Sequence, residues 1–283
     1  MKLLTWNIQW GRGCDGRVDF ARLAGEIRRI ADADVICLQE VAVNLPDLPG
    51  SAGEDGVALL RDAFPRHEAF YGVATDLPCA RGGRSRFGNL ILSRLPVLQV
   101  FRHLLPWPID PAVPSMQRIC VEVVVAARFG PLRVLTTHLE YYSALQRMAQ
   151  VEALREIHRT GGAHARSPRS RDEPDSPFAV LARGEAALLC GDFNFGPDAP
   201  EHARLSAPFD DETPGLVDCW QCLHPGLPQP PTAGAHEAAS PGRQHCCDFV
   251  FASENLTPRL ASIGVDGDTE ASDHQPVVLE LAQ

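Results

Sequence analysis

The chain has 283 residues, of which 45% are apolar and 22% are charged, so it is long enough to bury one large hydrophobic core or two modest ones. It carries 36 Asp and Glu against 26 Lys and Arg, which gives a formal net charge of -10. This balance argues against a protein whose main task is to coat nucleic acid, because such binding depends on neutralising phosphates, but it leaves room for an enzyme with a local basic cleft.

Short apolar runs separated by Gly- and Pro-rich turns predict β-strands along the whole chain. The predicted strands are Leu3–Ile8, Asp34–Gln39, Phe87–Ser93, Ile119–Ala126, Leu132–His138, Ala187–Cys190, Asp248–Ala252 and Pro276–Leu281. Two segments predict helices. Val18–Ala31 has apolar residues on one helical face, and Ser143–Arg159 opens with the S-x-x-Q capping box of Ser143 and Gln146.

Two segments predict flexible surface loops. Thr160–Pro177 is polar and rich in Gly, Pro and Ser, and His224–Cys247 is a long Pro/Gly connection. Strands of similar character continue on both sides of each loop. A single domain over residues 1–283, with its strands in two sheets, therefore fits better than two domains.

The sequence also bears on the cellular compartment. No stretch reaches the roughly 18 apolar residues that a membrane-spanning helix needs. The N-terminal MKLLTWNIQW lacks the apolar segment of a signal peptide. We therefore expect a cytoplasmic protein without a membrane span.

The nine cysteines are an odd number, and several lie in apolar strand-like runs, which indicates reduced buried thiols rather than a disulfide framework. One set has spacing that a zinc site would need: Cys219 and Cys222, followed by His245, Cys246 and Cys247. Adjacent residues of an extended chain point to opposite sides, so the last two cysteines do not easily bind one ion. Free cysteines are the better interpretation.

Polar residues gather where several predicted strands begin or end. They are Asn7, Glu40, His138, Asp192, Asn194, Asp248, Asp273 and His274. Strand ends at a sheet edge bring side chains from distant parts of a sequence together. Each residue alone equally fits a solvated turn, a strand-end cap or a core histidine, so the functional hypothesis depends on their joint occurrence.

These residue types suit one kind of chemistry. Carboxylate and amide oxygens are ligands for Mg²⁺, and Glu40 with Asn7, and Asp273 or Asp192, would supply them. Two histidines without a cysteine nucleophile suit proton transfer or stabilisation of a phosphoryl group. Asp192 and Asn194 would share one side of an extended chain, so that one takes a proton from water while the other orients it.

Seven segments, TWNIQW, VICLQEV, FGNLILSR, TTHLEYYSALQRMAQ, GDFN, DFVF and SDHQPV, together resemble the endonuclease/exonuclease/phosphatase superfamily. This superfamily includes pancreatic-type deoxyribonuclease, abasic-site endonucleases, neutral sphingomyelinases and inositol-polyphosphate 5-phosphatases. The resemblance extends from Leu3 to Leu281. It implies an α/β fold, a four-layer sandwich of two central, mostly antiparallel β-sheets flanked by helices, with a metal-dependent phosphoesterase site at one rim.

The resemblance implies a metal site. Asn7 and Glu40 match the superfamily's metal-site residues, and Asp273 matches an acidic residue close to the metal, which is Mg²⁺ with Mn²⁺ as a substitute. Several branches, the abasic endonucleases among them, carry Asp where this chain has Gln9. A neutral amide weakens a second metal site, so one ion is expected and the match to the abasic-site branch is lower.

The resemblance also implies catalytic roles. Asp192 and Asn194 match the pair that activates and orients the attacking water. Asp248 matches the aspartate that orients the final histidine, here His274. His138 matches a histidine of the deoxyribonuclease-like and phosphatase branches.

The segment CARGGRSRFGN is a local positive region in an acidic protein. We expect Arg81, Arg84 and Arg86 to bind a substrate phosphate away from the scissile one, and a solvated surface loop fits the same residues. Asn89 and Arg118 are further candidates for contacts to the scissile group.

Three functions remain open. The first is a Mg²⁺-dependent phosphodiesterase or phosphatase acting on a small or lipid-like phosphate ester, which the net charge and Gln9 favour. The second is a DNA or RNA nuclease, favoured by the His138 pattern and the arginine segment. The third is a catalytically silent binding module, against which the complete residue set argues. The partner implied is thus a phosphate ester, whether small molecule, lipid head group or nucleic acid, and no obligate protein partner is implied.

Overall fold

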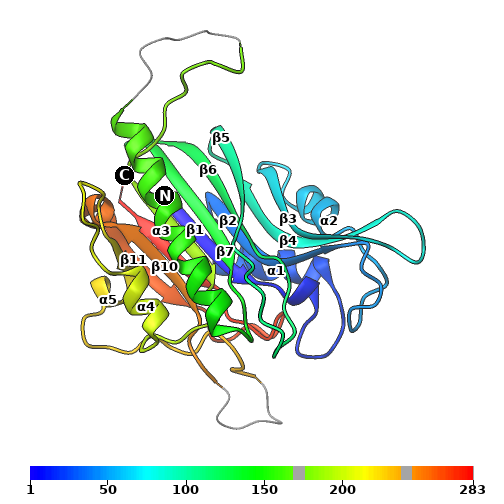
Figure 1. Cartoon of the computed structure of the whole chain (residues 1–283). Coiled ribbons are helices and arrows are strands. Elements are labelled where there is room, and N and C mark those ends of the chain that lie inside the picture. The colour runs from blue at the N-terminus through cyan, green and yellow to red at the C-terminus, as the bar shows by residue number, and fades with distance from the viewer. Residues whose placement is uncertain (168–175, 237–243, 283) are drawn as a thin grey trace.

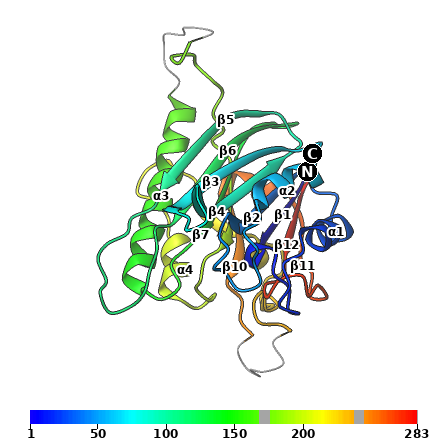
Figure 2. The same cartoon turned by 90° about the vertical axis from the view of Figure 1, so that its right-hand side faces the viewer.

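The computed structural model describes residues 1–167, 176–236 and 244–282. Its centre consists of two six-stranded β-sheets packed face to face, and helices lie along the outer faces (Figure 1). This arrangement is the layered α/β sandwich that the resemblance implies. The two chain ends lie together (Figure 2), where the Met1 amino group donates to the carbonyl of Leu281 at 2.8 Å.

The first sheet has the strand order β11-β12-β1-β2-β4-β3. Its strands are β1 (Lys2–Asn7), β2 (Val35–Val43), β3 (Glu68–Pro78), β4 (Arg84–Ser93), β11 (Leu260–Val265) and β12 (Val277–Leu281). β1 and β2 run parallel with Asn7 opposite Gln39, and the other neighbours are antiparallel. Asn7 therefore stands at the C-terminal end of a central strand.

The second sheet has the strand order β5-β6-β7-β8-β10-β9. Its strands are β5 (Val97–Leu104), β6 (Ile119–Ala127), β7 (Gly130–His138), β8 (Ala187–Asp192), β9 (Leu216–Asp218) and β10 (Asp248–Ser253). β7 and β8 are parallel with His138 opposite Asp192, and β10 runs antiparallel to β8 with Asp248 opposite Asp192. Three predicted site residues thus lie side by side at one rim.

The helices are α1 (Phe20–Ile30), α2 (Gly56–Ala63), α3 (Ala144–Arg166), α4 (Pro200–Leu205) and α5 (Cys219–Leu223). Asp19 caps α1 by accepting from the backbone N–H of Arg22. Ser143 caps α3 by accepting from the N–H of Gln146, as the S-x-x-Q pattern predicts. The Gln146 side chain instead donates to the carbonyl of Pro108 at 2.8 Å, so only half of the capping box forms.

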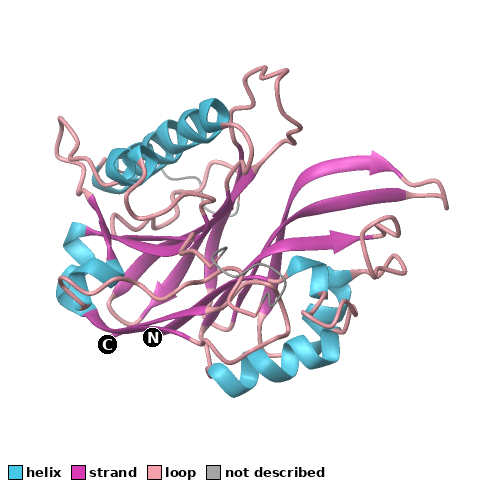
Figure 3. Ribbon diagram, turned by 90° about the horizontal axis from the view of Figure 1, so that it is seen from below, coloured by secondary structure: helices cyan, strands magenta, loops and turns pink. Residues whose placement is uncertain are grey.

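Three apolar clusters fill the spaces between layers. Leu3, Val35 and Cys37 of the first sheet pack against Val123 and Leu188 of the second. The outer face of the first sheet is covered by α1 and α2, and that of the second by α3 and α4. Figure 3 shows these helices on both outer faces with the strands between them. Burial on both faces explains why the central strands are almost continuously apolar.

The predicted loop Thr160–Pro177 is partly wrong, because α3 continues to Arg166. Gly161 and Gly162 of this Gly-rich segment lie inside the helix. Gly161 makes room for the buried guanidinium of Arg133, with which a Cβ at this position would collide. Arg133 donates to the carbonyls of His158 and Ile157, both at 3.0 Å, and so ties α3 to β7. Residues 168–175 of the predicted loop lie outside the described residues.

The described parts of the other predicted loop, residues 224–236 and 244–247, contain isolated β-bridges but no helix or longer strand. Ala233 bridges both His245 and His274, which brings this segment to the rim of the sheets. Residues 237–243 lie outside the described part of the chain. The assignment of residues 1–283 to one domain stays a prediction. In the described ranges, no helix has the length and apolar character needed to cross a bilayer.

Candidate active site

A cavity of about 400 Å³ opens at the rim where β1, β7 and β8 end. Seven of the residues singled out from the sequence line it: Glu40, Arg118, His138, Asp192, Asn194, Asp273 and His274. Asn7 and Asp248 lie directly behind this lining, because each is 1% exposed and hydrogen-bonds a lining residue. The structure therefore brings together every residue predicted for catalysis or metal binding.

Asp192 is the centre of the site. Its Oδ2 accepts from Asn7 Nδ2 at 3.0 Å and its Oδ1 accepts from the backbone N–H of Asn194 at 2.9 Å. The Nε2 atoms of His138 and His274 lie 3.4 and 3.8 Å from the same Oδ2. Strands of both sheets thus converge on one carboxylate that is only 1% exposed.

The segment after Asp192 is not extended, which corrects the expectation that Asp192 and Asn194 share a side of a strand. Asn194 has φ of +52°, and its N–H to Asp192 Oδ1 bond closes an Asx-type turn. Asn194 Nδ2 donates to the carbonyl of Leu139 at 2.9 Å. Phe193 is fully buried against Phe249 and Phe251 and anchors the turn. Both polar residues still face the cavity.

His274 is held by Asp248. Its Nδ1 donates to Asp248 Oδ2 at 2.9 Å. Burial alone would lower the pKa of His274, but the carboxylates of Asp248 and Asp192 outweigh it and raise the pKa well above the ordinary value. His274 is therefore an imidazolium at neutral pH, with Nε2 directed toward Asp192.

His138 has the opposite charge state. Burial, and then the positive charge of Arg118, lower its pKa to about 3, so it is neutral at physiological pH. Burial tends to raise the pKa of Asp192, but the charge of His274 and the hydrogen bonds from Asn7 Nδ2 and the Asn194 N–H lower it below the ordinary value. Asp192 is thus an ionised carboxylate between one neutral and one charged imidazole.

Glu40 lies inside a strand rather than after one. β2 continues to Val43, and its pairing with β4 is interrupted by a bulge between Leu38 and Val41. Glu40 has φ of +58°, and the bulge turns its side chain into the cavity. Its Oε1 accepts from Asn7 Nδ2 at 3.2 Å. The sequence prediction that the strand ends at Gln39 is therefore wrong, although the side chain reaches the predicted site.

The acidic residues of the site are crowded. Burial, and then the charges of Asp273 and Asp192, raise the pKa of Glu40 to about 7. Burial also raises the pKa of Asp273, whose Oδ2 accepts from Gln9 Nε2 at 2.5 Å. Oxygen ligands at a site where carboxylates repel one another fit a hard divalent cation, which would relieve that repulsion.

Two predicted substrate contacts lie near the cavity. Arg118 lines it and donates from Nε to Glu140 Oε2 at 3.3 Å. Asn89 is 2% exposed and donates to the carbonyl of Ile119 at 2.9 Å, which ties β4 to β6 across the sheets. Their contact with a substrate stays a prediction.

The arginine segment does not belong to the cavity lining. Arg84 Nε and Arg86 Nε lie 2.7 and 3.4 Å from the carboxylate of Asp76, and Arg81 donates to the carbonyl of Ala52 at 3.1 Å. These arginines are exposed and partnered at the protein surface. Binding of a distant phosphate by them stays a prediction.

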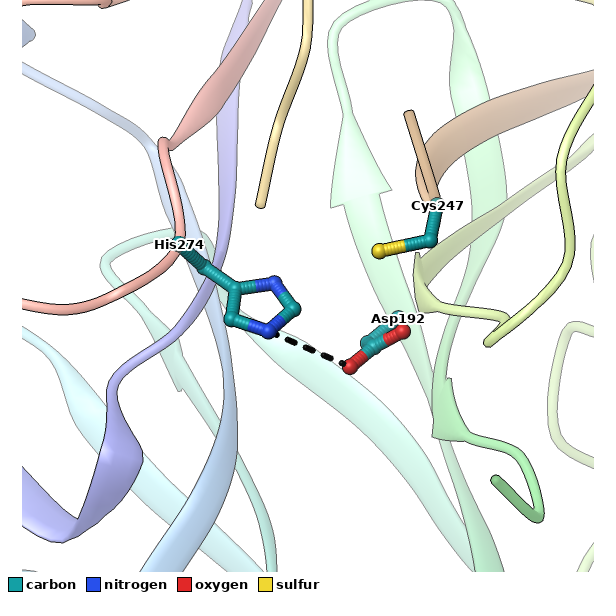
Figure 4. A group of neighbouring side chains, drawn as sticks. All are labelled: Asp192, Cys247 and His274. Carbon is teal, nitrogen blue, oxygen red and sulfur yellow. Dashed lines mark ion pairs between the residues drawn. The ribbon is translucent and has the colours of Figure 1, made fainter. Parts of the chain in front are cut away.

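None of the nine cysteines, all of which lie in the described ranges, forms a disulfide. Across the described ranges, Cys219, Cys222, His245 and Cys246 form no cluster with metal-binding geometry. The one such group found there is Asp192, Cys247 and His274, whose ligand atoms lie within 4.8 Å of one another (Figure 4). The sequence pattern relates Cys247 only to the zinc spacing, and that zinc cluster does not form among the residues that the structure describes.

Sequence reasoning missed the aromatic wall of the cavity. Trp10, Phe87, Tyr141 and Tyr142 line it, and the two tyrosine rings form an edge-to-face pair with centroids 4.8 Å apart. Both tyrosines are more than half exposed, at 57% and 59%. The signal was available, because a Tyr-Tyr pair directly after a site strand is unusual for a solvated turn.

A family model for the endonuclease/exonuclease/phosphatase family matches residues 4–274. No curated protein matches the chain. Among solved structures, an endonuclease/exonuclease/phosphatase from Beutenbergia cavernae is 26% identical, with a TM-score of 0.67 over 100% of this chain and 72% of that one.

Two further structures share the fold at lower identity. A mannosyl-6-phosphatase from Bacteroides thetaiotaomicron is 16% identical, with a TM-score of 0.67 and full coverage of both chains. The TDP2 protein of D. rerio, complexed with a single-strand DNA product, is 17% identical, with a TM-score of 0.64 over 100% of this chain and 99% of that one.

Proposed function

Because the chain belongs to the endonuclease/exonuclease/phosphatase family, we propose that it is a divalent-metal-dependent hydrolase that cleaves a phosphate ester through an in-line water. The observation that carries this proposal is the ionised, buried Asp192 between a neutral and a charged imidazole at the cavity wall. Asp192 supplies a base, His274 a cation and His138 a neutral hydrogen-bonding group at one point of the cavity, and this combination suits phosphoryl transfer to water.

Glu40, Asn7 and Asp273 would hold the metal, Mg²⁺ or Mn²⁺. When bound, the ion polarises a phosphoryl oxygen and stabilises the charge that develops on it. The Gln9 side-chain amide donates a hydrogen bond to Asp273 Oδ2, and Arg12 Nη1 donates to Gln9 Oε1 at 3.2 Å. This chain of contacts keeps Asp273 oriented and favours one metal ion.

Asp192 takes the proton from the attacking water. Asn194 orients that water through its side-chain oxygen, because its side-chain nitrogen is committed to the carbonyl of Leu139. The hydrogen bonds from Asn7 and the Asn194 N–H keep the carboxylate in place and ionised. Little reorganisation is then needed during the reaction.

His274 stabilises the reacting phosphoryl group. Asp248 holds its Nδ1–H, so its Nε2–H is presented to a negatively charged oxygen in the cavity. His138 contributes a second imidazole, whose Nε2 lies 3.4 Å from Asp192 Oδ2. Because it is neutral, His138 serves as a hydrogen-bond partner and not as a second cation.

The cavity favours a small or lipid-like ester over nucleic acid. Arg118 is the one Arg or Lys among the described residues that line it, and it already forms an ion pair with Glu140. A polynucleotide would bring further phosphates to a protein with a formal net charge of -10. The aromatic wall instead offers apolar area to the alcohol portion of a substrate.

Hydrolysis assays test this proposal. Purified protein is incubated with Mg²⁺ or with EDTA and bis-p-nitrophenyl phosphate, p-nitrophenyl phosphate or plasmid DNA. We expect p-nitrophenol to be released only when Mg²⁺ is present. We expect the plasmid DNA to remain uncut. Mg²⁺-dependent plasmid cleavage would instead identify a nuclease. Silence on all three substrates, with no bound metal, would identify a binding module.

A further inference from the structure

We propose that Asp192, Cys247 and His274 form a second cation site, selective for a soft divalent ion such as Zn²⁺, and that its occupation inhibits the enzyme. The site is distinct in its ligand types from the oxygen ligands proposed for Mg²⁺. Its inhibitory effect rests on the proposed function, whereas binding of the ion does not.

The three ligands come from three separate segments. Asp192 ends β8, Cys247 directly precedes β10, and His274 lies in the segment before β12. A carboxylate oxygen, a thiol sulfur and an imidazole nitrogen lie within 4.8 Å of one another, and the side chains point toward a common point (Figure 4). With Zn–S of about 2.3 Å and Zn–N and Zn–O of about 2.0 Å, a tetrahedral site places nitrogen and oxygen ligands roughly 3.3 Å apart and the sulfur roughly 3.5 Å from each. His274 Nε2 lies 3.8 Å from Asp192 Oδ2 and all three ligand atoms lie within 4.8 Å of one another, so the side chains must close in on the ion when it binds.

Neighbouring groups orient the ligands as they do in zinc proteins. Asp248 Oδ2 accepts from His274 Nδ1 at 2.9 Å, which leaves Nε2 for the ion in a carboxylate–histidine–metal arrangement. The Asn194 N–H holds Asp192 Oδ1 at 2.9 Å, and Oδ2, which also accepts from Asn7 Nδ2, is the oxygen nearer to His274. In the metal-free protein the Cys247 thiol donates to Asp248 Oδ2 at 3.4 Å, which holds the sulfur beside His274 until the ion displaces the thiol proton.

The ligand types select the ion. Mg²⁺ takes oxygen ligands and avoids a thiolate, whereas Zn²⁺ binds sulfur, nitrogen and carboxylate oxygen in one tetrahedral shell. Cys247 and Asp192 are each 1% exposed, so the site is buried on the protein side. Asp192 and His274 both face the 400 Å³ cavity, which gives the ion an entry path and a water molecule as fourth ligand.

The consequence follows from the residues that are shared. An ion on Asp192 Oδ2 occupies the base that takes the proton from water, and an ion on His274 Nε2 removes the donor to the phosphoryl oxygen. On binding, the Cys247 thiol and the His274 imidazolium each release a proton to solvent. Zn²⁺ bound at this site would thus stop hydrolysis even when Mg²⁺ is abundant.

Cobalt spectroscopy of the full-length protein tests the site without any activity measurement. Co²⁺ bound by a thiolate gives an intense near-ultraviolet sulfur-to-metal band, and added Zn²⁺ should abolish it. Cys247→Ser should remove this band and weaken Zn²⁺ binding, measured by calorimetry, by at least about tenfold. The matched controls are Cys246→Ser, which changes the buried neighbour, and Cys222→Ser, which changes an exposed thiol. Both control proteins should keep the sulfur-to-metal band and the Zn²⁺ affinity of the wild type.

Each result decides between the two proposals. A wild-type protein without the sulfur band, or a Cys247→Ser protein that keeps it, overturns the second site. A band that Cys247→Ser removes, in a protein that hydrolyses no ester, supports the site and refutes the proposed function. If the protein hydrolyses an ester, the Zn²⁺ concentration for half-inhibition should be at least tenfold higher in Cys247→Ser than in the wild type. Inhibition of each protein is measured against its own activity without Zn²⁺. If Cys247→Ser does not fold, Asp192→Asn should reduce Zn²⁺ affinity in its place.

Discussion

Replacement of Asp192 by Asn is the sharpest test of the catalytic assignment. The substitution keeps the shape of the side chain but removes the base. General-base catalysis contributes about 10²–10⁴-fold to a rate, so we expect kcat to fall about 10³-fold. The fall should appear in kcat rather than in KM, because Asp192 acts on water and not on the ester.

The same substitution has a calculable effect on stability. In the wild-type protein both carboxylate oxygens accept hydrogen bonds, from Asn7 Nδ2 and from the Asn194 N–H. Whichever way an amide at this position turns, its NH₂ group meets one of these donors. One buried donor thus loses its partner, which costs about 1–2 kcal/mol, and the melting temperature should fall by a few degrees.

The assay compares steady-state hydrolysis of the p-nitrophenyl esters with thermal unfolding followed by circular dichroism. Asp198→Asn is the matched control, because it makes the same change on the exposed part of the following turn and should alter neither quantity. A folded Asp192→Asn protein with kcat within tenfold of wild type would refute the role of Asp192 as base.

Three further predictions concern pH, packing and substrate. In the metal-free protein, the free energy of unfolding should fall by up to about 3 kcal/mol as the pH rises from 4.5 to about 7, because Glu40 in the folded protein holds a proton that the unfolded chain has released. Denaturant titration measures this pH dependence, which should be weaker in Glu40→Gln. Added Mg²⁺ should reduce the loss of stability. Gly161→Ala should lower the free energy of unfolding by about 2 kcal/mol, because the added Cβ meets the Arg133 guanidinium. Gly162→Ala, the control, should raise it by up to about 1 kcal/mol. Equal melting temperatures for the two variants would contradict the contact between α3 and β7. Tyr141→Ala should raise KM about tenfold for esters with aromatic alcohols and leave kcat unchanged, while Tyr141→Phe should match wild type; a KM that does not respond would argue against stacking on this wall.

The central strands were predictable from the sequence and the edge strands were not. All eight predicted strands are found within a few residues of their expected ends. The four that were missed, β3, β5, β9 and β11, are the outer strands of the two sheets. Central strands are buried on both faces and read as apolar runs, whereas β5 and β11 are mostly exposed or half-buried and carry polar residues.

The gathering of site residues was also predictable, because strand ends converge at a sheet rim. The register of β7, β8 and β10 places His138, Asp192 and Asp248 on adjacent strands. The orientation of Cys247 toward the same point was not predictable, since it depends on how the segment before β10 is held by Thr232, whose hydroxyl accepts from the Cys247 N–H at 3.1 Å. Contacts made by irregular segments leave no periodic signal.

Backbone strain identifies the same site independently of its chemistry. Among the described residues, positive φ values outside glycine occur at Gln9, Trp10, Glu40, Asn44 and Asn194. Three of these line the cavity, and a fourth, Gln9, hydrogen-bonds Asp273. Such conformations cost about 1–3 kcal/mol each and persist only where the surrounding structure holds them. The bulge that strains Glu40 is also what turns its carboxylate toward Asn7 and the cavity, because an unbroken strand would continue its inward and outward alternation past this point. The fold therefore gives up stability at these positions to place the ligands and base of the proposed reaction.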